Sequence, residues 1–124
     1  MGDTFDVSHY LGVFIEEAKE HIESLEENLV KLEKEPYNQD LIQAIFRSFH
    51  TIKGSSGSMG FQQMTELAHL LENLLDRVRR GEVSVSSSLI DLLLQGVDFL
   101  KRMLEEITKK GQEPDWNMEE IFSA

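Results

Sequence analysis

The chain has 124 residues, 23 of them acidic and 12 basic, which gives a formal net charge of −11. Its length suits one domain with a single core, and its 40% hydrophobic and 28% charged residues are typical of a globular protein, not of a disordered one. The acidic balance argues against nucleic acid or an anionic membrane surface as a partner, and the lack of cysteine excludes disulfides, a thiolate nucleophile and a cysteine-based zinc site.

The first predicted element is a long amphipathic helix over residues 8–34. Apolar side chains recur along it every three or four residues, and glutamates occupy the other faces. Pro36 marks its end, and at ~1.5 Å per residue it would span roughly 40 Å, the length of a small bundle. The apolar stripe consists of Phe14, Ala18, Ile22, Leu25, Leu29 and Leu32.

Two further amphipathic helices follow, separated by a stretch over residues 54–60 that is rich in glycine and serine. Asp40 is the predicted N-cap of the second helix, and the third is predicted over residues 61–80, with Gly81 just beyond its end. Their apolar stripes consist of Ile42, Ile45, Phe49 and Ile52, and of Met64, Leu67, Leu71, Leu74 and Val78.

A fourth helix is predicted to begin after the serines at residues 86–88, and a short fifth helix after Pro114, where Trp116 would dock. These elements predict an all-α fold: an antiparallel up-down-up-down four-helix bundle with a short fifth C-terminal helix, in a single domain over residues 1–124. The acidic residues 1–6 do not resemble a signal peptide, and no stretch reaches the ~18 apolar residues of a membrane span. A cytoplasmic domain without membrane insertion is therefore expected.

The sequence around His50 is not explained by a bundle core. On a helical wheel His50 lies about 120° from the centre of its apolar stripe, and Lys53 lies between the two. Gly54 and Gly57 fall within about 40° of His50, and glycine inside a helix costs up to ~1 kcal/mol relative to alanine. Two glycines on one helix face suggest a surface without side chains, which a bulky group can approach closely. The alternative is that residues 54–60 are only a turn and His50 is a surface histidine.

Glu72 lies on the flank of the third helix, and antiparallel packing against the second helix would bring it beside His50. A carboxylate that accepts from one ring N–H fixes the tautomer and raises the basicity of the other nitrogen. His69 is one turn earlier but points more directly away from the apolar stripe. Spacing alone favours an ordinary surface histidine there.

A metal site is the main rival interpretation. Residues 66–69 form an E-x-x-H motif of the kind used in di-iron bundles, but the chain offers only a weak D-x-x-H at residues 6–9 as its partner. Residues 54–60 are not a phosphate-binding P-loop, because they follow a helix and Lys53 precedes the glycines. We therefore expect no metal site and no nucleotide loop.

Two runs of residues resemble known signatures. Residues 46–61 contain H-x-x-K-G-x-x-x-x-x-G, which resembles the signature of histidine-phosphotransfer (HPt) domains. Residues 69–76, with the pattern H-x-x-E-N-x-L-D, and residues 80–82 resemble the second signature of the phosphoacceptor (P1) domain of CheA-type chemotaxis histidine kinases. The opening of that domain is similar to residues 10–18, and the whole resemblance covers about residues 5–110.

The resemblance implies a role for each polar residue of the site. His50 would be the phosphoaccepting imidazole, and Glu72 would hydrogen-bond the ring and leave its opposite nitrogen nucleophilic. Lys53 would offset phosphate charge, and His69 would belong to the same polar cluster.

The resemblance also implies the partners. A histidine kinase catalytic domain would supply ATP and Mg²⁺ and phosphorylate His50, which would pass the phosphoryl group to an aspartate in the receiver domain of a response regulator. Gly54 and Gly57 would keep the docking surface open. The domain would be a monomer, would bind no cofactor of its own and would be the substrate domain of a protein kinase, not catalytic alone.

Two other functions stay open at this point. One is a free-standing relay protein between a hybrid kinase and a regulator, and the other is a non-catalytic acidic bundle that binds partner helices. The charge distribution favours phosphotransfer, because residues 41–80 carry five basic and three acidic side chains and the excess acidity lies outside them.

Overall fold

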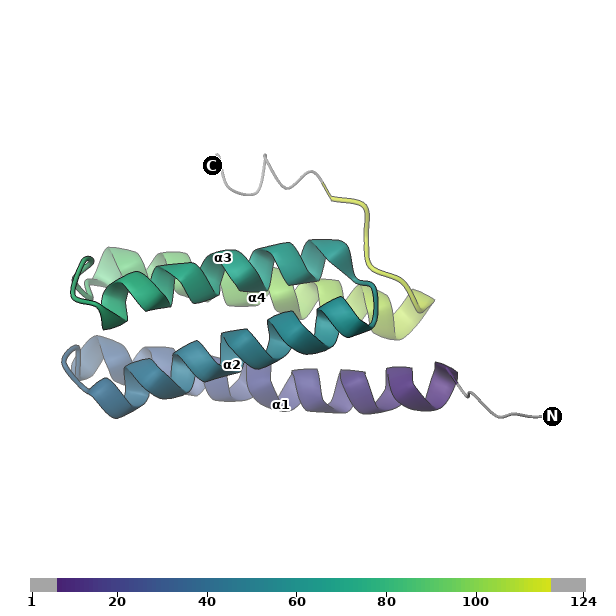
Figure 1. Ribbon diagram of the computed structural model, residues 1–124, viewed down its shortest axis with the longest axis horizontal. Helices are drawn as coiled ribbons and strands as arrows, with labels where there is room; N and C mark the ends of the chain where they lie inside the picture. Colours follow the sequence, from purple (N-terminus) through teal and green to yellow (C-terminus); the bar gives the residue numbers. More distant parts are fainter. Residues whose placement is uncertain (1–6, 117–124) are drawn as a thin grey trace.

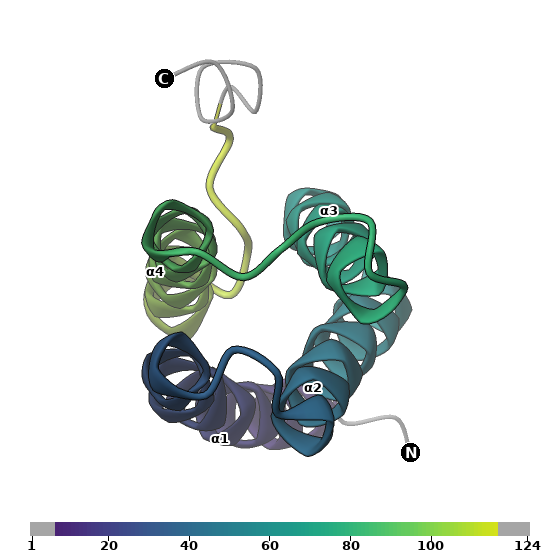
Figure 2. The same ribbon diagram turned by 90° about the vertical axis from the view of Figure 1, so that its left-hand side faces the viewer.

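The computed structural model describes residues 7–116, and in that part of the chain it contains four helices and no strand: α1 (Val7–Lys34), α2 (Gln39–Ser58), α3 (Gln62–Arg79) and α4 (Ser87–Lys110). Successive helices run antiparallel along the long axis (Figure 1), and the end view shows them arranged around a common core (Figure 2). The predicted all-α four-helix bundle is confirmed. The fifth helix is not, since Asp115 and Trp116 are not helical and residues 117–124 lie outside the described residues.

The apolar stripes predicted from the sequence line the core of the bundle. Each helix contributes side chains with almost no exposed surface. Burial of their apolar area stabilises the fold by about 25 cal/mol per Å². Phe49 is the largest of the completely buried side chains and lies next to His50 in the sequence. The core therefore fixes the orientation of α2 directly beneath the candidate site.

The ends of α2 differ from the prediction. Its N-cap is Asn38, not Asp40: the Asn38 side-chain oxygen accepts from the Leu41 N–H at 3.1 Å, and Asp40 lies in the first turn. At the other end the helix continues through Gly54 and Gly57 to Ser58. The turn that follows is made by Gly60, whose φ of +82° is in the left-handed region.

The connections after α3 agree better with the sequence. Gly81 follows the C-cap of α3 with a φ of +79°, and Ser86 caps α4 by accepting from the Leu89 N–H at 3.1 Å. No described helix is both long and apolar enough to cross a membrane.

A short segment after α4 folds back onto α3. The Glu113 carboxylate accepts from the backbone N–H groups of Gln63 at 3.0 Å and Met64 at 3.1 Å, and so caps a helix whose own N-cap residue, Phe61, makes no side-chain cap bond. Trp116 packs edge-on against Phe99, with ring centroids 6.0 Å apart, so it docks on the bundle as predicted, although Trp116 itself is not helical.

Candidate functional site

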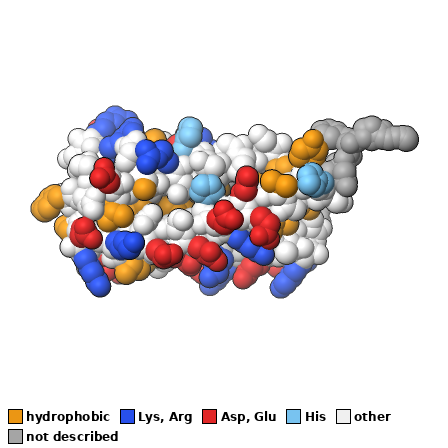
Figure 3. Space-filling model, turned by 90° about the horizontal axis from the view of Figure 1, so that it is seen from below, with side chains coloured by type: hydrophobic (Ala, Val, Ile, Leu, Met, Phe, Trp, Pro, Cys, Tyr) orange, Lys and Arg blue, Asp and Glu red, His pale blue; other side chains and the backbone are white. Residues whose placement is uncertain are grey.

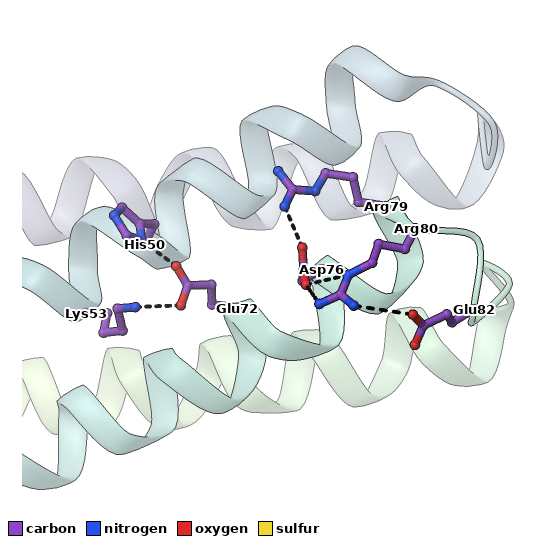
Figure 4. Close-up of polar contacts among 7 residues, drawn as sticks. All are labelled: His50, Lys53, Glu72, Asp76, Arg79, Arg80 and Glu82. Carbon is purple, nitrogen blue, oxygen red and sulfur yellow. Dashed lines mark hydrogen bonds and ion pairs between the residues drawn. The ribbon is translucent and has the colours of Figure 1, made fainter.

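The site is built on the facing sides of α2 and α3. His50 projects from the middle of α2 with 62% of its side chain exposed, and its Nδ1 contacts the Oε2 atom of Glu72 on α3 (Figure 4). The structure thus brings together the two residues that antiparallel packing was expected to juxtapose.

Glu72 is more buried than its flank position on the helical wheel suggested. Only 5% of its surface is exposed, although it carries a charge. The second carboxylate oxygen, Oε1, accepts a hydrogen bond from Lys53 Nζ at 2.8 Å. Both oxygens of the carboxylate are therefore engaged by groups from α2, which satisfies the buried charge.

The pKa of Glu72 results from two opposing effects. Burial raises it, but the hydrogen bonds and positive charges of Lys53 and His50 together outweigh burial and hold the pKa below the ordinary value of 4.5. The carboxylate is therefore ionised at neutral pH and can only accept hydrogen bonds. In the neutral imidazole this contact places the ring proton on Nδ1 and leaves the lone pair on Nε2, which points away from Glu72 (Figure 4).

The other predicted site residues lie around this pair in different ways. Lys53 keeps 28% of its side chain exposed while its ammonium pairs with Glu72. His69 is exposed on α3, and within the described chain it makes no hydrogen bond or ion pair with His50 or Glu72. Gly54 faces open space, with nothing within 4 Å of a Cβ built there, whereas a Cβ on Gly57 would meet the Thr65 side chain at 3.7 Å. The bare surface therefore belongs to Gly54, and Gly57 lies at the seam between the helices.

A hollow beside His50 contains residues to which the sequence analysis gave no role. It is lined by Phe46, Arg47, Asn73, Asp76 and Arg79 together with His50 and Glu72. Helical spacing could have indicated two of these residues. Phe46 is four residues before His50 and Asp76 is four residues after Glu72, so each lies on the same helix face as a predicted site residue.

Asp76 organises the charged end of this hollow. It accepts hydrogen bonds from both Arg79 and Arg80 (Figure 4), and Arg80 in turn contacts Glu82 at 3.5 Å. The hydrogen bond from Arg80 is the main cause of a lowered Asp76 pKa, and the one from Arg79 adds to it. The same contact with Asp76 raises the pKa of Arg80.

The wider surface is strongly charged. Figure 3 shows one face of the molecule on which acidic side chains are numerous, with lysine and arginine side chains among them. No cluster of three or more histidine or acidic residues suited to a metal ion occurs within residues 7–116. The E-x-x-H pair Glu66 and His69 is exposed on α3.

Comparison with known proteins identifies similar chains. The family model described as "Hpt domain" matches residues 9–110. A chemotaxis protein CheA from Bacillus subtilis is 43% identical over 106 residues, which cover 86% of this chain but only 16% of that protein. The chain thus spans about a sixth of the length of this curated relative.

Solved structures share the fold. The CheA phosphotransferase domain from Thermotoga maritima is 45% identical with a TM-score of 0.77, and the match covers 81% of this chain and 95% of that one. The phosphorylated P1 domain of CheA3 in complex with CheY6 from R. sphaeroides is 25% identical with a TM-score of 0.83, covering 90% and 88% of the two chains.

The lowered pKa of Glu72 predicts how its contribution to stability depends on pH. A carboxyl group whose pKa is lower in the folded state stabilises the fold fully above its unfolded value, near 4.5, and loses this contribution as the pH falls through its folded value. Glu72→Gln should therefore be less stable than the parent at pH 7, and the difference should shrink on acidification below pH 4.5. Urea denaturation across this range measures it.

The matched control is Glu66→Gln, which changes an exposed glutamate on the same helix. It should alter stability little at any pH. A deficit of Glu72→Gln that stays constant or grows as the pH falls would contradict the ionised, doubly paired carboxylate.

Proposed function

The chain belongs to the Hpt domain family, and from this premise we propose that it is the phosphoacceptor domain of a chemotaxis histidine kinase, with His50 as the residue that carries the phosphoryl group. One observation carries the assignment to His50: the buried Glu72 carboxylate holds Nδ1 while the opposite edge of the ring lies in solvent. A nitrogen lone pair is thus presented outward on a rigid helix.

The accepting step follows from this geometry. The Nε2 lone pair attacks the γ-phosphorus of ATP held by a kinase catalytic domain, an N–P bond forms, and the bond from phosphorus to the bridging oxygen breaks to release ADP. The imidazole gains positive charge as it attacks, because Nδ1 keeps its proton. Glu72 is already ionised and in contact with Nδ1, so it stabilises this charge without reorganisation.

The donating step is the reverse process with a different acceptor. A carboxylate oxygen of a response-regulator aspartate attacks the phosphorus, the N–P bond breaks, and the neutral imidazole returns. The similarity to a P1 domain solved in complex with CheY6 supports a receiver domain as this partner. The open surface at Gly54 supports it as well, because a partner can approach there without meeting a side chain.

Lys53 has two roles in this proposal. Its ammonium holds Glu72 in place at 2.8 Å, and, from its position three residues after His50 on the same helix, it offsets the negative charge of a phosphoryl group on His50. His69 is assigned only to the polar surroundings of the site. ATP and Mg²⁺ are supplied by the kinase and the regulator. We assign residues 1–124 to one domain that acts as a cytoplasmic monomer.

Phosphorylation should be confined to His50. Incubation with a chemotaxis kinase catalytic domain and radiolabelled ATP should give acid-labile label on the parent and none on His50→Gln, because an amide lacks the nucleophilic lone pair. His21→Gln changes a histidine on α1, outside the site, and should label like the parent. Equal label on the parent and His50→Gln would disprove the assignment.

The Glu72 carboxylate should accelerate the reaction. Glu72→Ala should lower the phosphorylation rate by roughly 10–100-fold, the usual cost of removing a group that orients a reactive imidazole. Circular dichroism should show that the variant remains helical, because the apolar core is unchanged. An unaltered rate in a folded Glu72→Ala variant would remove Glu72 from the mechanism.

A further inference from the structure

Phe46 makes a contact with His50 that the mechanism above does not use. It lies on α2 one turn before His50, is half-buried and packs against the core. Its ring is nearly parallel to the imidazole, with an angle of 12° between the planes and 6.3 Å between the centroids. This separation is within the range of interacting aromatic rings.

Phe46 is itself held from α3. The Arg79 guanidinium lies over the phenyl ring, with its central carbon 4.2 Å from the centroid, which is a cation–π contact. Asp76 fixes that guanidinium by a hydrogen bond and is in turn held by Arg80, whose Nε donates to it at 2.9 Å (Figure 4). The phenyl ring is thus confined by the core on one side and by a braced cation from the facing helix.

The contact with Glu72 does not by itself determine the plane of the imidazole. One hydrogen bond restrains only one ring nitrogen, and rotation about the Cβ–Cγ bond of histidine has a broad energy minimum, so coupled changes of the two side-chain torsions can tilt the ring while the bond is kept. In-line attack on phosphorus requires the lone pair to keep one direction. A parallel, immobile ring beside the imidazole limits this pivoting.

We propose that Phe46 is a positioning residue that fixes the plane of the His50 imidazole, and that Arg79, braced by Asp76, holds the Phe46 ring in place. The consequence for phosphoryl transfer rests on the proposed function of His50. The claim that Phe46 fixes the ring plane is independent of that function, because it concerns only the order of the His50 side chain in the unphosphorylated domain.

The test compares Phe46→Leu, which keeps apolar bulk but removes the ring, with Phe46→Tyr, which keeps the ring. Three-bond NMR couplings and ring–ring nuclear Overhauser effects report whether the His50 side chain adopts one orientation or averages over several. The matched control is Phe99→Leu, because Phe99 is also half-buried and also lies beneath an arginine, Arg102, but on α4. Circular dichroism and urea denaturation verify that each variant folds.

Phe46→Leu should show averaged His50 couplings and a kcat for phosphorylation reduced roughly tenfold with KM unchanged, because loss of alignment affects the reacting complex and not docking. Phe46→Tyr should show the couplings and the kcat of the parent, and Phe99→Leu should alter neither the couplings nor kcat. Arg79→Gln should change the His50 couplings and kcat less than Phe46→Leu does. It should change neither further when added to Phe46→Leu, since Arg79 acts on His50 only through the Phe46 ring.

Two results would overturn the proposal. Unaveraged couplings in a folded Phe46→Leu variant would show that Glu72 alone orders the ring. A change confined to KM would show that Phe46 contacts the kinase instead. If the parent itself is not phosphorylated, the proposed function fails, but the couplings still decide whether Phe46 orders His50.

Discussion

A single buried carboxylate, Glu72, determines how the site is built. A charge removed from water is costly unless it is paired, and here both carboxylate oxygens are paired, one with Lys53 and one with His50. Because both partners come from α2 and the carboxylate from α3, these two helices must keep one register and one separation. The hydroxyls of Ser56 and Thr65, 3.0 Å apart across the same seam, are consistent with that close approach.

The division between scaffold and site follows from this constraint. α1 and α4 supply core side chains and 11 of the 19 acidic residues within residues 7–116, and they contribute no residue to the hollow beside His50. α2 and α3 carry the His50 imidazole to which we assign the reaction, the carboxylate that contacts it and the cations around it. Residues 41–80, which include most of α2 and α3, carry five basic and three acidic side chains in a chain of net charge −11, which suits the proposed transfer of a phosphoryl group to an acidic partner.

Sequence periodicity predicted the four helices well, because each apolar stripe is long and regular enough to specify a helix on its own. The N-cap of α2 was misplaced by two residues because Asn38 and Asp40 are both good caps, and only the backbone geometry distinguishes them. The fifth helix was predicted from Pro114 and nearby apolar residues. Within the described residues, Glu113 and Trp116 anchor the non-helical start of this segment to α3 and α4, and the rest of the predicted helix lies outside those residues.

The site was less predictable than the fold, for a physical reason. A helical wheel gives the angle of a side chain on its own helix, but the burial of Glu72 and the contact of Arg79 with Phe46 depend on how closely two helices approach. His50, Lys53 and Glu72 were selected because they lie off the apolar stripes and belong to runs that resemble the two signatures, and the structure brings the three side chains into contact. Phe46 resembled one more apolar residue, and Gly57 could not be distinguished from Gly54 without the neighbouring helix.

The role of the buried carboxylate is tested most directly by the tautomer of the neutral His50 ring, observed by long-range ¹H–¹⁵N NMR in the unphosphorylated domain. We expect a protonated Nδ1 and an unprotonated Nε2 in the parent, and loss of this preference in Glu72→Ala. A parent whose proton lies on Nε2, or whose tautomer is unchanged when Glu72 is removed, would contradict the central role of the buried carboxylate.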